Sequence, residues 1–162
     1  MKTTALLATL ALLAAQAASA ASGASTSGSS ALALASLVAD HSPSLTPQEH
    51  EVMSDLLDGR LNFSFPPDRT IQVTADSVSC RASNVDITSH VCELTFGKKT
   101  VKLQGRQAHE VFATVLEAGV APDAAAGTIF EALSQLACTI NPGEIQQKAG
   151  GGANCKFVAE AP

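Results

Sequence analysis

The chain has 162 residues, a formal net charge of −5, four cysteines, six Phe and neither Trp nor Tyr. An acidic chain with no block of lysine or arginine argues against nucleic-acid binding, because that affinity comes mostly from neutralising phosphates. The scarcity of aromatic residues also disfavours surfaces that bind sugars or bases by stacking, since these depend on aromatic rings.

The N-terminal segment has the three parts of a cleavable signal peptide. Lys2 supplies a positive start, residues 5–15 form an apolar run of Ala and Leu with one Thr, and residues 18–20 are small enough for a signal peptidase. The run is shorter than the ~20 apolar residues that a membrane-spanning helix needs. We therefore expect cleavage after Ala20, export to the periplasm or the extracellular space, and a mature chain without a membrane span.

Residues 21–44 are rich in Ala, Ser and Gly. Such a stretch buries too little apolar surface to offset its ordering entropy, so we expect a flexible tether. An apolar patch within it is compatible with a short helix that docks on the domain: Leu32, Leu34, Leu37 and Val38. Residues 45–162 are expected to form a single α+β domain.

A helix is predicted to begin after Thr46. Thr46 is a favourable N-cap, Pro47 suits the first helical position, and Glu49 completes a capping box. One apolar stripe follows, and Gly59 is expected to end the helix. The stripe consists of Val52, Met53, Leu56 and Leu57.

Alternating apolar residues then predict three strands. The first covers residues 71–82, and its apolar positions change phase, so we expect a bulge near residues 76–77. The second covers residues 91–96, and a turn at residues 97–98 leads into a third strand around Val101 and Leu103.

Helical spacing returns with apolar side chains at Ala108, Val111, Phe112, Val115 and Leu116, and Gly119 is expected to end this helix. A second long helix is predicted to begin at Pro122, and residues 141–143 are expected to end it. Its expected buried face is Ala126, Ile129, Phe130, Leu133 and Leu136. Cys155, Phe157 and Ala159 indicate a last strand, and we find no internal repeat in the sequence.

These elements predict an α+β fold with a three- to four-stranded antiparallel sheet, covered on one face by two or three helices and stapled by two disulfides. Of the three possible pairings, we favour Cys80–Cys92 and Cys138–Cys155, the pairs closest in sequence. A metal site built from Cys80, His90 and Cys92 is the alternative, but it lacks the C-x-x-C spacing of structural zinc. No metal or other cofactor is expected.

A basic cluster is the predicted binding surface: Lys98, Lys99, Lys102 and Arg106. At the tip of a hairpin and the start of the next helix, it would suit an acidic protein or an anionic envelope polymer as partner. An ordinary solvated turn whose lysines protect a sheet edge is the alternative explanation.

Catalytic signatures are weak. G-x-S-x-G, H-E-x-x-H and G-x-x-x-x-G-K-[ST] are all absent from the sequence. The best candidate is a small hydrolase centred on His109 with Glu110 or Glu117, although a boundary histidine and a solvated ion pair from Arg106 to Glu110 explain the same residues. We therefore predict an exported, non-enzymatic binding, adaptor or inhibitor module. The hydrolase and a structural cell-envelope component remain as alternatives.

Overall fold

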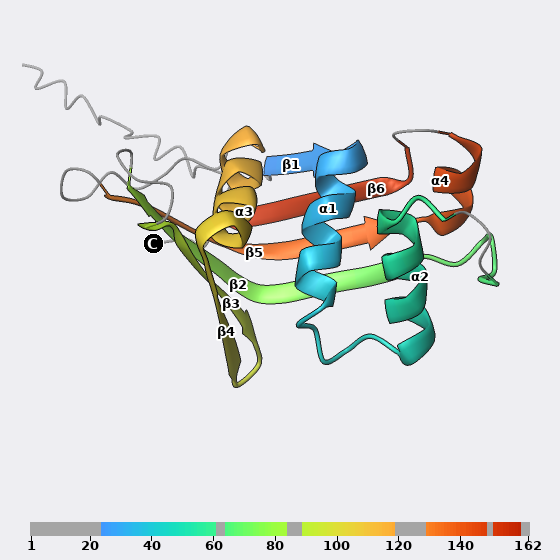
Figure 1. Cartoon of the computed structure of the whole chain (residues 1–162), viewed down its shortest axis with the longest axis horizontal. Helices are drawn as coiled ribbons and strands as arrows, with labels where there is room; N and C mark the ends of the chain where they lie inside the picture. The colour runs from blue at the N-terminus through green and yellow to red at the C-terminus, as the bar shows by residue number, and fades with distance from the viewer. Residues whose placement is uncertain (1–23, 61–63, 84–88, 119–128, 149–150, 160–162) are drawn as a thin grey trace, which may run out of the picture.

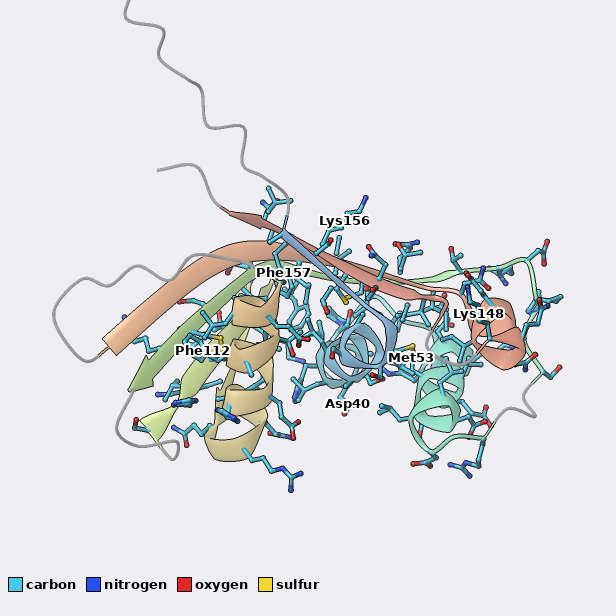
Figure 2. The ribbon with its side chains drawn as sticks, turned by 90° about the horizontal axis from the view of Figure 1, so that it is seen from above. Asp40, Met53, Phe112, Lys148, Lys156 and Phe157 are labelled. Carbon is cyan, nitrogen blue, oxygen red and sulfur yellow. A yellow bond between two sulfur atoms is a disulfide. The ribbon has the colours of Figure 1, made fainter. Side chains whose placement is uncertain are left out.

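The chain forms a six-stranded antiparallel sheet with its main helices on one face (Figures 1 and 2). The structure is a computed structural model that describes residues 24–60, 64–83, 89–118, 129–148 and 151–159. The strands are β1 (Ala24–Ser27), β2 (Ile71–Ser83), β3 (Val91–Phe96), β4 (Lys99–Gln104), β5 (Ile129–Ile140) and β6 (Ala153–Ala159). The helices are α1 (Gly28–Ala39), α2 (Pro47–Leu57), α3 (Gly105–Glu117) and α4 (Pro142–Gln147).

The strand order in the sheet is β1-β6-β5-β2-β3-β4. The predicted α+β class is confirmed, while the predicted three to four strands and two or three helices fall short of the six strands and four helices in the described residues. Both predicted disulfides are present, Cys80–Cys92 between β2 and β3 and Cys138–Cys155 between β5 and β6. Their residues lie directly opposite each other in the strand registers.

One face of the sheet is buried because side chains alternate along each strand. In β6, Cys155 and Phe157 are fully buried beneath the helices, while Lys156 is exposed on the opposite face (Figure 2). The predicted bulge in β2 is confirmed as a register shift between Ala75 and Val78, which returns the apolar residues to the buried face.

The start of α2 follows the sequence prediction. The Thr46 hydroxyl accepts a hydrogen bond from the Glu49 backbone N–H, and the Glu49 carboxylate accepts one from the Thr46 backbone N–H. Val52, Met53 and Leu56 form its buried face. This local signal was sufficient because all its partners lie within one helical turn.

Part of the segment that we expected to be a tether is instead integral to the fold. Residues 24–27 form β1 at the edge of the sheet, paired with β6, and α1 follows directly. Ala31, Ala35 and Val38 are fully buried in the core. The small side chains that suggested a tether here allow the helix to lie close to the sheet. The predicted signal peptide lies outside the described residues.

The predicted second long helix is wrong where the structure describes it, because residues 129–140 form β5. Apolar runs of this kind fit a helix or a buried strand equally well in local sequence. Hydrogen-bonded pairing with β2 on one side and β6 on the other selects the strand. Asn141 and Pro142 then start α4 rather than end a helix, and the Asn141 side chain accepts a hydrogen bond from the Glu144 backbone N–H.

The fold contains an internal repeat that we did not find in the sequence. One half is β2-β3-β4-α3, and the other is β5-β6-β1-α1, in which the N-terminal β1-α1 unit completes the C-terminal hairpin (Figure 1). Each half has a disulfide between its first two strands, and the second cysteine lies opposite a residue of the third strand. These register pairs are Cys92 with Leu103 and Cys155 with Thr26.

The passage from strand to helix is also the same in both halves. Two residues after Leu103 and after Thr26, a glycine with positive φ starts the helix, Gly105 (φ 60) and Gly28 (φ 70). Three residues later, an alanine lies on the disulfide of its own half. The Ala108 carbonyl oxygen is 3.3 Å from Cys92 Sγ, and the Ala31 carbonyl oxygen is 3.4 Å from Cys155 Sγ.

The two halves are therefore related by an approximate twofold axis between the central strands β2 and β5. The buried positions of the helices correspond as well, with Ala31, Leu34, Ala35 and Val38 in α1 matching Ala108, Val111, Phe112 and Val115 in α3. A tandem comparison of the sequence misses this repeat because the order of one half is circularly permuted.

Candidate functional site

A pocket lies between α1 and α3, which run side by side in opposite directions on the helical face of the sheet (Figure 1). Its volume is about 280 Å³. This value lies near the lower end of the roughly 300–1,000 Å³ typical of small-molecule sites. The lining residues are Ser30, Ala33, Leu34 and Leu37 of α1 and His109, Glu110, Val111, Ala113 and Thr114 of α3.

The pocket is formed by corresponding positions of the two halves. Leu34 corresponds to Val111, and both face the pocket from their own helices. Apart from this shared apolar pair, the two walls differ. Ala33 and Leu37 of α1 correspond to Glu110 and Thr114 of α3. The pocket therefore combines an apolar wall with a polar one, the combination that binds a ligand and fixes its orientation.

A pair of histidines joins the polar wall to the sheet. His109 Nδ1 lies 3.2 Å from Nδ1 of His90, the residue that precedes β3. His90 is 6% exposed, and its ring meets the ring of Phe112 edge-on, with 5.5 Å between centroids. Because the same nitrogen of each ring takes part, one imidazole donates the hydrogen bond and the other accepts it.

The histidine pair has no counterpart in the other half of the molecule. The residue two positions before Cys155 is Ala153, where the first half has His90 before Cys92, and Leu32 corresponds to His109. Ala153 is buried, and Leu32 packs against the core. Apolar side chains thus satisfy the packing of this position in the second half, so packing alone does not require two imidazoles in the first.

The residues of the predicted hydrolase are only partly brought together. His109 and Glu110 both line the pocket, but His109 forms its hydrogen bond with His90. The Glu110 carboxylate accepts a hydrogen bond from Arg106 Nε at 3.2 Å, in the ion pair that the sequence suggested. Glu117 lies exposed near the end of α3. Among the described residues, no carboxylate is recorded in a hydrogen bond that would orient His109 as a general base.

The predicted basic surface is divided in the structure. Lys99 lies opposite the buried Phe96, on the helical side of the sheet, and its Nζ donates a hydrogen bond to the His41 backbone oxygen at 3.2 Å. Lys102 lies opposite Glu93, on the other face. Alternation of side chains along β4 separates these two lysines.

The other two members of the basic cluster lie in the turn before β4 and at the start of α3. Lys98 is exposed in the turn between β3 and β4, and Arg106 pairs with Glu110 at the start of α3. The structure therefore does not bring the four basic residues together into one patch.

The alternative metal site is wrong, because Cys80 and Cys92 are joined in a disulfide and offer no thiolate to a metal beside His90. Among the described residues, no group of three or more His, Cys, Asp and Glu side chains is placed to hold a metal ion. In the same part of the chain, every helix is too short or too polar to cross a bilayer.

Sequence reasoning identified parts of this site without assembling them. His109 and Glu110 were singled out for catalysis, and Leu34 and Leu37 as an apolar patch, but nothing local indicated that α1 and α3 are neighbours. Comparison of the chain with protein-family models, with curated proteins and with solved structures finds no match.

Proposed function

We propose that the protein is an exported, non-enzymatic binding module that takes a small, largely apolar ligand in the pocket between α1 and α3. The single observation that carries the proposal is the pocket itself, a concave site with one apolar and one polar wall. Export rests on the features of residues 1–20, and two disulfides fit an oxidising compartment.

The chemistry of the walls defines the ligand class. Ala33, Leu34 and Leu37 would cover an aliphatic body, and Glu110 would face a head group that donates hydrogen bonds. The Thr114 hydroxyl donates a hydrogen bond to the Glu110 backbone oxygen at 2.8 Å, so it would act toward a ligand as an acceptor. An aliphatic amine or alcohol therefore fits this site better than a carboxylate, which the Glu110 charge disfavours.

Straight-chain amines, alcohols and carboxylates of equal length provide the test. We expect saturable binding of the amine and the alcohol, with amide shifts in α1 and α3 measured by NMR, and weaker binding of the carboxylate. Ala33→Trp adds a ring at an exposed position that lines the pocket, and we expect about a tenfold or greater loss of affinity, equivalent to about 1.4 kcal/mol.

Ser54→Trp is the matched control, because it adds the same ring at an exposed position of α2, outside the pocket. It should leave probe binding unchanged. Binding that is insensitive to Ala33→Trp, or shifts confined to other elements, would contradict the proposal.

A small hydrolase is the second candidate, favoured by the position of His109 on the pocket wall. It predicts that an ester of the best-bound alcohol is turned over and that His109→Gln abolishes this turnover. Binding of the alcohol without hydrolysis of its ester supports the binding module.

A further inference from the structure

We propose that the His90–His109 pair is a pH-sensitive latch that holds the polar wall of the pocket at neutral pH and releases it when both rings carry a proton. This inference rests on the proposed function, because the regulated site is the pocket between α1 and α3. The observation behind it is the contact between the two Nδ1 atoms, 3.2 Å apart, at the junction of β3 and α3.

Proton counting defines the two states of the latch. With both rings neutral, one Nδ1–H donates to the other Nδ1, and one added proton on the donor ring leaves that hydrogen bond intact. A second proton places an N–H on both nitrogens, so neither accepts, and two positive charges face each other. Imidazoles ordinarily change charge between about pH 5 and pH 8, so mild acid is the relevant range.

The described parts of the elements around the pair carry few charged side chains. α1 has no ionisable side chain, and on α3 Arg106 and Glu110 are paired with each other. On β3 and β4, Glu93 and Lys102 lie opposite each other on the far face of the sheet. Arg81 of β2 is exposed, and the cysteines beneath α3 are in a disulfide. Among the groups named here, the two imidazoles are the ones that ordinarily change charge in mild acid.

Release of the latch would be local. α3 is anchored on the sheet by Ala108, Val111, Phe112 and Val115, none of which titrates. Loss of the histidine contact frees the His109 side chain and the adjacent pocket wall while this apolar interface persists. The expected response is a change in the pocket, not unfolding.

The other half of the molecule supplies the test variant. His90→Ala combined with His109→Leu installs the residues that occupy the corresponding positions, Ala153 and Leu32. His50→Asn removes an imidazole from α2 as the matched control. If the double variant fails to fold, His109→Asn keeps an amide partner for His90 and removes one titrating ring.

The first experiment needs no ligand. NMR of ¹⁵N-histidine-labelled protein should show two coupled titration steps for His90 and His109, and the second step should shift amides at the starts of β3 and α3. The double variant should lose these shifts, His109→Asn should reduce the pair to one step, and His50→Asn should leave both steps unchanged. Independent titration of the two rings with no amide shifts would overturn the latch.

The second experiment uses the straight-chain alcohol, because this probe carries no titrating group. Its affinity should fall by about fivefold or more from about pH 7.5 to pH 5, and the double variant should bind equally at both. If the unmodified protein binds the alcohol with equal affinity at both pH values, the latch is overturned, while the proposed binding site is unaffected. Coupled titration in a protein that binds no probe at either pH would support the latch and overturn the proposed function.

Discussion

The two halves of the molecule build the same unit from different side chains. In each, two disulfide-linked strands pair with an edge strand, a positive-φ glycine starts a helix, and an alanine lies on the disulfide. The helices differ in their surroundings. α1 lies between α2 and α3, whereas α3 contacts α1 on one side and leaves another face exposed (Figure 1).

This difference explains why one helix was predicted in full and the other only as a short patch in a tether. A helix with a solvent-exposed face needs polar residues there, and α3 has Arg106, Gln107 and Glu110 on its exposed side. A helix with neighbours on several sides is apolar and small nearly all round, and α1 has no charged residue. The same structural role therefore gives two different sequence patterns.

The largest expected effect comes from placing the same charge on each helix. Ala35→Glu buries a carboxylate at a fully buried position of α1, and we expect a loss of about 3–5 kcal/mol in the free energy of unfolding. Ala113→Glu adds a carboxylate at an exposed position of α3 and should change it by less than about 0.5 kcal/mol. Urea unfolding measures the free energy of unfolding of both variants. Equal losses would contradict the difference in burial between these two positions.

The disulfides should contribute nearly equally, because they close loops of similar length, with separations of 12 and 17 residues. Replacing Cys80 and Cys92 together by Ala, or Cys138 and Cys155 together, should each lower the free energy of unfolding by about 3 kcal/mol in the chain-entropy model. Calorimetry of the two double variants tests this equality. A several-fold difference would mean that the two halves are not equivalent in stability.

The smallest expected effect tests the shared start of the helices. Gly28→Ala and Gly105→Ala each place a side chain at positive φ, which costs about 1–2 kcal/mol. The space around Gly105 is open, so backbone conformation alone should set the cost there. Gly143→Ala is a poor control, because its Cβ would meet the Pro67 backbone. Neutral results at both positions would contradict the expected cost of positive φ, and clearly unequal losses would contradict the proposed equivalence of the two strand-to-helix passages.

The sequence predicted the elements whose signals are short-range. The capping box at Thr46 and Glu49, the phase change in β2 and the spacing of α3 each involve residues close together in the chain. The disulfide pairings were also predicted, because the nearest cysteines are the ones that the two hairpins join. Each of these features is decided by local geometry.

The candidate site depended on contacts that no local pattern contains. His109 was noticed, but its partner His90 is 19 residues away and belongs to another element. The apolar wall of the pocket comes from α1, some 77 residues before the polar wall in the chain. β5 was predicted as a helix because its apolar spacing fits both structures, and only its pairing with β2 and β6 selects the strand.

By itself, the sequence determined the class of fold, the two disulfides and the helices that have a solvent-exposed face. Each of these follows from short-range periodicity, from capping or from proximity along the chain. Only the tertiary structure decided the placement of the N-terminal segment, the permuted repeat and the pocket with its histidine pair. The physical reason is that burial depends on what lies across the sheet and beside each helix. Those neighbours come from opposite ends of the chain.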